Sequence, residues 1–180
     1  YRVENYWNKF NVENRFTFIY VGRISMEKNI DHLLKSFTQF NKKKIKANLV
    51  LVGDGPLRER LQKIYTSPNI LFTGYLYAEE LTTAYASADC FVFPSMTDTF
   101  GNVVLEAHAC GLPAIVSNEG GPQEIVDSHK SGIIVNMRLS GALENALREI
   151  MENNSLFKEL QKNAISKAKS SRWEYALEKL

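Results

Sequence analysis

The chain has 180 residues, of which 44% are hydrophobic and 23% charged, and its 22 Lys and Arg against 20 Asp and Glu give a net charge of +2. A domain of this size buries roughly 70% of its unfolded surface, so it needs neither disulfides nor a metal for a stable core. The near-balance of charge gives no support to nucleic-acid binding, and no apolar run is long enough for a membrane span or a signal-peptide core.

Along the chain, residues 1–14 are polar and aromatic without a clean period, and we expect them to be a lead-in or linker before a domain over residues 15–170. Six short runs follow that are mostly apolar on both faces, which is typical of strands buried in a parallel sheet. These runs are Phe16–Val21, Leu49–Val52, Ile70–Phe72, Cys90–Phe93, Ala114–Ser117 and Ile133–Val135.

The stretches between these runs have a helical period. Ile30, Leu33, Leu34 and Phe37, for example, follow the spacing of a helix with one buried face. The alternation predicts an α/β fold with a doubly wound, mostly parallel, six-stranded Rossmann-like sheet. After Val135 three helical stretches follow, roughly 139–152, 156–169 and 172–180, with no further strand.

Two smaller features concern cellular location. Cys90 and Cys110 have no CxxC spacing, and we expect two buried structural thiols and a cytoplasmic protein. The basic run of Lys42, Lys43, Lys44 and Lys46 is either a solvated turn or a peripheral contact with anionic lipid at the inner face of a membrane.

Doubly wound sheets bind ligands outside the carboxyl ends of their strands. The loops predicted there are polar, each of the five contains glycine, and together they point to one cleft. They are residues 22–29, 53–56, 73–78, 94–101 and 118–122.

The first of these loops carries Arg23 and Lys28, which flank the start of a predicted helix. Backbone N–H groups at a helix start favour anions, so the pair suits phosphate, although two ordinary surface cations would have the same spacing. Gly53-Asp54-Gly55-Pro56 resembles part of a dinucleotide fingerprint but lacks the third glycine, and a tight turn explains it equally well. No GxxxxGK[ST] motif occurs, which excludes P-loop hydrolysis.

The fourth loop leads into a helix that Thr99, Gly101 or Asn102 could cap. Asp98 and Glu106 are eight residues apart, about 12 Å along a helix. That is too far for the two carboxylates of a glycoside hydrolase, which lie roughly 5–10 Å apart, but it suits an extended ligand with hydroxyls at both ends and phosphate between. Glu106 has apolar neighbours on both sides in the sequence, which favours a functional role over a solvated surface position.

The remaining motifs limit the chemistry. Gly120 and Gly121 could let the backbone approach a ligand, or could form a structural turn. His32, His108 and His129 share no metal-ligand spacing, and there is no HExxH or DxD motif, so we expect no metal site. No GxSxG elbow is present for a serine nucleophile.

Taken together, these loops resemble the C-terminal, donor-binding domain of the group 1 glycosyltransferases, family 4-like retaining enzymes of two-Rossmann-domain (GT-B) architecture. The resemblance runs from about Phe16 to the end of the chain. The motifs that carry it, in order, are Val21-Gly22-Arg23 with Glu27-Lys28, Leu51–Pro56, Phe72–Tyr75, Ala88-Asp89 with Phe93–Ser95, Thr99–Ala107, Gly111–Pro113 and Gly120–Glu124.

The resemblance implies a role for each matching residue. Arg23 and Lys28 would hold the donor diphosphate, Asp98 would approach the transferred sugar, and Glu106 would bind the ribose hydroxyls. Arg23, Lys28 and Asp98 would be the catalytic residues. The donor site would also include the turn at Tyr75 and Leu76, where the base would lie, together with Gly22, Phe100, Gly101, Asn102 and Val103.

The resemblance also implies a nucleotide-sugar substrate, no cofactor, and an acceptor glycan, lipid or small molecule bound by an N-terminal domain that this chain lacks. Residues 171–180, with Trp173, resemble the start of the helix that crosses back to that domain, so we expect the fragment alone to be inactive. Two alternatives remain open: a nucleotide-sugar epimerase of the same architecture, and a non-catalytic nucleotide-sugar-binding module. Asp98 stands where the family usually has Glu, and the base, sugar, acceptor and linkage are left undetermined.

Overall fold

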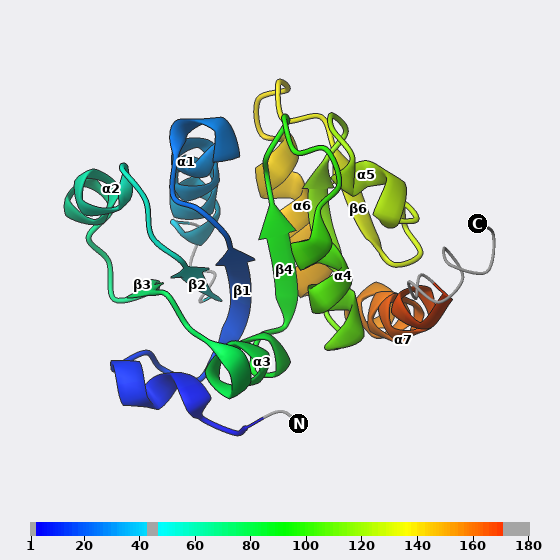
Figure 1. The fold of residues 1–180 in the computed structure, drawn as a ribbon, viewed down its shortest axis with the longest axis horizontal. Helices are drawn as coiled ribbons and strands as arrows, with labels where there is room; N and C mark the ends of the chain where they lie inside the picture. The colour runs from blue at the N-terminus through cyan, green and yellow to red at the C-terminus, as the bar shows by residue number, and fades with distance from the viewer. Residues whose placement is uncertain (1–2, 43–46, 171–180) are drawn as a thin grey trace.

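Six parallel strands form the centre of the structure, a computed structural model that describes residues 3–42 and 47–170 (Figure 1). Their spatial order is β3-β2-β1-β4-β5-β6, the order of a doubly wound Rossmann sheet, which confirms the predicted fold class. The strands are β1 (Phe16–Val21), β2 (Ala47–Val52), β3 (Ile70–Gly74), β4 (Cys90–Phe93), β5 (Ala114–Ser117) and β6 (Gly132–Val135).

The strands lie in the sheet because nearly all of their side chains are apolar. β1 and β2 pair in register from Phe16 with Ala47 to Val21 with Val52, and every residue of β2 is buried. β1 and β4 point the same way in Figure 1, toward the loops at their carboxyl ends. The loops in which a ligand site was predicted therefore share one edge of the sheet.

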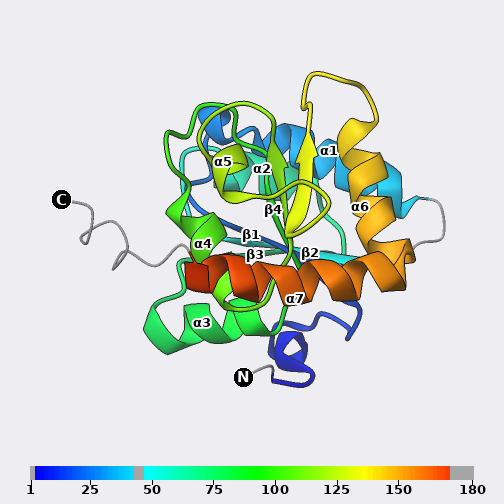
Figure 2. The ribbon, with the colours of Figure 1, turned by 90° about the vertical axis from the view of Figure 1, so that its right-hand side faces the viewer.

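Helices connect the strands and cover both faces of the sheet (Figure 2). α1 packs beside α6, and α4 packs beside α7, which runs across the lower part of the domain in Figure 2. The helices are α1 (Ile30–Asn41), α2 (Arg58–Ile64), α3 (Ala78–Ala86), α4 (Asn102–Ala109), α5 (Pro122–Ile125), α6 (Ala142–Glu152) and α7 (Asn154–Ser170).

The segment before β1, which we expected to be a lead-in or linker, packs against the domain. It contains a short 3₁₀ helix, Tyr6–Phe10, in which Trp7 is buried. The Trp7 indole Nε1 donates a hydrogen bond to the carbonyl of Ser87, just after α3, at 3.0 Å. Figure 1 shows this segment beside α3. Its aromatic residues thus contribute to the core.

Two predictions concern parts of the chain that the structure does not describe. Lys43, Lys44 and Lys46, on which the lipid contact depends, lie outside the described residues, as does the predicted crossover segment 171–180. Over residues 3–42 and 47–170, none of the helices has both the length and the apolar character needed to cross a bilayer.

The two cysteines are free thiols, Cys90 buried and Cys110 half-buried. Burial raises the pKa of both thiols above the ordinary value. Neither is therefore a reactive thiolate at neutral pH.

His108 of α4 is a buried titratable side chain. The side chain is fully buried, its Nδ1 lies 3.0 Å from the carbonyl of Leu112, and its Nε2 has no hydrogen-bond partner among the described residues. Burial is the main cause that lowers the pKa of this imidazole below its ordinary value.

We expect the free energy of unfolding to fall as the pH is lowered from 7 to 5. The unfolded chain takes up the His108 proton first, near its ordinary pKa of 6.5, while the folded imidazole stays neutral to lower pH. Urea denaturation at both pH values measures the loss, which should be smaller in His108→Gln than in the wild type. An equal loss in the variant and the wild type would contradict this assignment.

Candidate functional site

A buried tyrosine holds the turn that follows β1. The Tyr20 hydroxyl donates a hydrogen bond to the carbonyl of Arg23 at 2.8 Å. A Cβ on Gly22 would lie 2.8 Å from the same hydroxyl, so glycine is needed there. Burial raises the pKa of Tyr20, which therefore stays a hydrogen-bond donor. The Arg23 side chain extends from this turn into solvent and forms no ion pair within the described ranges.

The loops after β1 and β2 touch each other through two glycines. A Cβ on Gly53 would lie 2.1 Å from the carbonyl oxygen of Gly22, and one on Gly55 would lie 2.4 Å from that of Ile24. The Ile24 amide also donates to the carbonyl of Asp54 at 2.9 Å. Contact between the two loops thus explains the Gly53-Asp54-Gly55 sequence. The third glycine of a dinucleotide fingerprint is not needed for this contact.

The structure brings Lys28 and Asp98 together, although they are 70 residues apart in the sequence. Lys28 Nζ lies 2.5 Å from Asp98 Oδ1, and each side chain is only 20% exposed. The ammonium also lies 5.8 Å from the centroid of the Phe93 ring, which stacks on Tyr20. The second oxygen, Asp98 Oδ2, is buried without a hydrogen-bond partner in the described part of the chain. An unpaired buried carboxylate oxygen is rare in folded proteins and marks this position as unusual.

Longer hydrogen bonds support this pairing of the loops after β1 and β4. The carbonyl of Glu27 accepts from Ser95 Oγ at 3.4 Å and from Thr97 Oγ1 at 3.5 Å, and Asn29 Nδ2 donates to the carbonyl of Pro94 at 3.4 Å. The Ser25 hydroxyl donates to the carboxylate of Glu27, and this bond lowers the pKa of Glu27. The loop that carries Lys28 is thus held against the one that carries Asp98.

The N-terminus of α4 is not capped by a side chain. The cap position is Gly101, in a left-handed conformation with φ +93°, rather than Thr99 or Asn102. Within the described residues, the backbone N–H groups of Asn102 and Val103 therefore have no capping partner, and they lie at the positive end of the helix dipole. Phe100, just before them, is 51% exposed. This helix end is suited to an anion.

Gly120 and Gly121 are needed for contact with the neighbouring loop. A Cβ on Gly121 would lie 2.0 Å from the carbonyl oxygen of Thr99, and one on Gly120 would lie 2.7 Å from that of Asp98. The Gly121 amide donates to the carbonyl of Asp98 at 2.7 Å. Close contact between the two loops therefore accounts for both glycines. The hydrogen bond from Gly121 holds the backbone of Asp98 in place.

Glu106 and the turn at Tyr75 and Leu76 are not bonded to the Lys28–Asp98 pair in the described part of the chain. Glu106 is exposed on α4, and its Oε2 accepts a hydrogen bond from the hydroxyl of Tyr85 at 3.0 Å. Tyr75, 58% exposed, and Leu76, half-buried, follow β3. No hydrogen bond or ion pair within residues 3–42 and 47–170 joins either group to Lys28 or Asp98.

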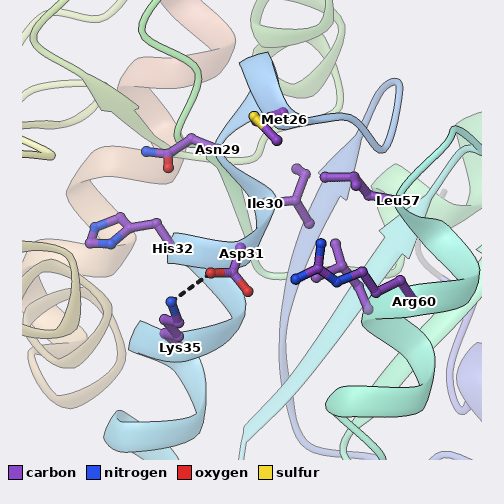
Figure 3. A pocket seen from close by; sticks show the side chains of 9 residues that line it. Met26, Asn29, Ile30, Asp31, His32, Lys35, Leu57 and Arg60 are labelled. Atoms are coloured by element: carbon purple, nitrogen blue, oxygen red, sulfur yellow. Dashed lines mark ion pairs between the residues drawn. The ribbon is translucent and has the colours of Figure 1, made fainter.

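A cavity of about 400 Å³ lies between α1 and α2, beside the loop that carries Lys28 (Figure 3). Arg60 of α2 faces α1 across it, where Asp31 pairs with Lys35 at 2.7 Å. None of the residues predicted to bind the donor lines this cavity. The lining residues are Met26, Asn29, Ile30, Asp31, His32, Lys35, Leu57, Arg60 and Leu61.

Sequence reasoning missed three aromatic residues that support the site: Tyr20, Phe93 and Tyr85. The signal for two of them was a tyrosine among buried apolar residues, because a buried hydroxyl needs a hydrogen-bond partner. No group of three or more His, Cys, Asp or Glu that could hold a metal occurs in the described part of the chain.

With this geometry in place, comparison with known proteins decides the family. The profile of the family described as "Glycosyl transferases group 1" matches residues 3–170. The chain belongs to the group 1 glycosyltransferases. This confirms that the sequence resembles the group 1 glycosyltransferases.

Individual relatives show how far the similarity reaches. A sulfoquinovosyl transferase of Arabidopsis thaliana is 44% identical over 114 residues, 63% of this chain and 22% of that protein. A GDP-mannose-dependent alpha-mannosyltransferase of Mycobacterium tuberculosis is 36% identical over 151 residues, 84% of this chain and 37% of that protein. This chain therefore covers well under half of either relative.

Among solved structures, sucrose-phosphate synthase from Thermosynechococcus elongatus superposes with a TM-score of 0.83 at 29% identity. The superposition covers 99% of this chain and 47% of the other. This chain therefore corresponds to about half of that synthase.

Proposed function

We propose that this chain is the donor-binding half of an enzyme that transfers a sugar from a nucleoside-diphosphate sugar to an acceptor, with retention of anomeric configuration. The observation that carries the proposal is the Lys28–Asp98 contact at 2.5 Å, which joins a cation and a carboxylate from two different strand ends. Arg23 and the uncapped N-terminus of α4 lie at the same edge of the sheet. A diphosphate and a sugar hydroxyl need cations, N–H donors and a carboxylate acceptor in this way.

In this proposal the chain acts by positioning and by electrostatics. Arg23, Lys28 and the N–H groups of Asn102 and Val103 stabilise the departing diphosphate, where negative charge develops. Asp98 Oδ2 accepts a hydroxyl of the transferred sugar. The ribose lies at Glu106 and the base at Tyr75 and Leu76, while Gly22, Phe100 and Gly101 shape the backbone around the ligand.

A thermal-shift panel of UDP, GDP and ADP, each with and without an attached hexose, tests the proposal. A ligand present at 100 times its Kd stabilises a protein by about 2.7 kcal/mol, so binding should raise the unfolding temperature visibly. At least one nucleoside diphosphate should bind, and its sugar derivative should bind at the same site. No shift with any member of the panel would overturn the proposal.

We further propose that the acceptor, a glycan, a lipid or a small molecule, is bound by a part of the enzyme outside these 180 residues, and that the enzyme works in the cytoplasm or at the inner face of a membrane. The coverage of 37% of the mannosyltransferase supports a larger enzyme. These 180 residues alone should then give no transfer product. Detection of glycosylated acceptor with the purified chain would contradict this.

Donor binding should not require a divalent cation. The donor phosphates are proposed to be neutralised by Arg23, Lys28 and the N-terminus of α4, and these groups keep their charge without metal. Calorimetric titration of UDP and GDP should therefore give the same Kd, within about twofold, in excess EDTA and in millimolar Mg²⁺. A tenfold or larger loss in EDTA would show that the residues named here do not suffice.

A further inference from the structure

Tyr85 of α3 lies at a point where two separate elements meet. Its side chain is only 2% exposed, its ring lies 6.0 Å from that of Phe91 in β4, and its hydroxyl reaches Glu106 of α4. The bond joins residues 21 apart in the sequence, at 3.0 Å. Figures 1 and 2 both show α3 and α4 next to each other.

The hydrogen bond from Tyr85 makes the two oxygens of the Glu106 carboxylate inequivalent. Oε2 of Glu106 accepts the hydrogen bond of Tyr85, whereas Oε1 has no hydrogen-bond partner within residues 3–42 and 47–170. A glutamate on an exposed helix face normally samples many rotamers, and ordering it costs conformational entropy when a ligand binds. The hydrogen bond from the buried phenol of Tyr85 fixes one carboxylate oxygen of Glu106. Part of the entropy cost is therefore removed before a ligand binds.

The Tyr85 hydroxyl is a dependable donor. Burial, followed by the nearby charge of Glu106, raises the pKa of this phenol above its ordinary value. The hydroxyl therefore keeps its proton at neutral pH and donates it in the hydrogen bond to Glu106.

We propose that Tyr85 is a positioning residue for the nucleotide: it holds the Glu106 carboxylate so that the free oxygen meets the 2′- and 3′-hydroxyls of a ribose. This inference rests on the proposed function and adds a residue on another helix to the donor site. It predicts that the enzyme distinguishes ribonucleotides from dideoxyribonucleotides through Tyr85 as well as through Glu106.

Calorimetric titration of UDP, GDP and ADP, with their 2′,3′-dideoxy counterparts, tests the proposal on the wild type and on Tyr85→Phe. The preference of the wild type for ribose over dideoxyribose should fall about threefold to tenfold in Tyr85→Phe, because Glu106 loses its charge-assisted hydrogen bond and must be ordered by the ligand. The dideoxy ligand should bind both proteins alike. The substitution keeps the buried ring, so the fold is expected to persist, and circular dichroism checks this.

Tyr65→Phe is the matched control. Its hydroxyl also donates to a carboxylate, that of Asp31, at 2.9 Å, but this pair lies between α1 and α2. The control should leave the ribose preference unchanged. In Glu106→Ala the preference should be lost, and adding Tyr85→Phe to that variant should change nothing further.

The outcomes separate this inference from the proposed function. Equal weakening of ribose and dideoxyribose ligands in Tyr85→Phe would overturn the positioning role, as would an unchanged preference. An unchanged preference in Glu106→Ala would overturn it too, and would place the ribose elsewhere. Failure of all three nucleoside diphosphates to bind the wild type would overturn both proposals.

Discussion

Replacing Arg23 with alanine should weaken the binding of a nucleoside diphosphate by about tenfold to a hundredfold, and should barely change the binding of the bare nucleoside. A charge-assisted hydrogen bond to phosphate contributes on the order of 1.5–3 kcal/mol, and the nucleoside lacks the group that Arg23 would contact. The Arg23 side chain is exposed and free of ion pairs within the described residues, so its removal should leave the fold intact. Calorimetry with both ligands measures the difference.

Arg60→Ala is the control for this substitution. Arg60 is also an exposed arginine, but it lines the cavity between α1 and α2. Added salt should reduce the wild-type affinity for the diphosphate more than for the nucleoside, because exposed charges are screened within about 10 Å at 0.1 M. If Arg60→Ala gave the larger loss, the nucleotide would bind at that cavity, and equal losses for both ligands in Arg23→Ala would place the phosphates away from Arg23.

Gly121→Ala should destabilise the fold by about 2–4 kcal/mol, because overpacking and a lost hydrogen bond add up. The added Cβ would lie 2.0 Å from the Thr99 carbonyl oxygen, so the loops after β4 and β5 must separate. The bond from the Gly121 amide to Asp98 would then lengthen. For a domain of this size we expect the midpoint of thermal unfolding to fall by roughly 5–15 °C. Donor affinity should fall as well, since Asp98 moves.

Gly141→Ala separates the steric effect from backbone strain. Gly141 has φ +75°, and a Cβ there would meet no atom within 4 Å. Only the left-handed conformation is then penalised, at a cost of about 1 kcal/mol. Scanning calorimetry of both variants should show the larger loss in Gly121→Ala. Equal losses would mean that the loop contact is not tight.

The arrangement of the sheet could be predicted because the strands are apolar on both faces and the helices between them on one. β1, β4 and β5 have the predicted bounds, whereas β2 begins two residues early at Ala47 and β3 extends to Gly74. Such ends depend on the neighbouring strand, which the sequence alone does not reveal. The packing of Trp7 against Ser87 was likewise out of reach, because it joins residues 80 apart.

Some features of the candidate site could likewise be predicted from the sequence, and others could not. Lys28 and Asp98 were predicted as separate ligands from their positions at two strand ends, but their mutual ion pair depends on how the two loops meet. For Glu106 the apolar neighbours suggested an unusual environment, yet the side chain is exposed and contacts Tyr85. The glycines were singled out from the sequence with a ligand-facing and a structural interpretation both open. Their partners are backbone oxygens of adjacent loops, which a sequence pattern does not identify.

The glycine contacts have a consequence for protein engineering. The loops after β1 and β2 interlock at Gly53, and those after β4 and β5 at Gly121. A loop transplanted alone from another family member would meet a partner shaped for a different backbone. Chimeras designed to change donor choice should therefore exchange loops in pairs, keeping each glycine with the carbonyl it faces. The unit that can be swapped between these enzymes is the matched pair.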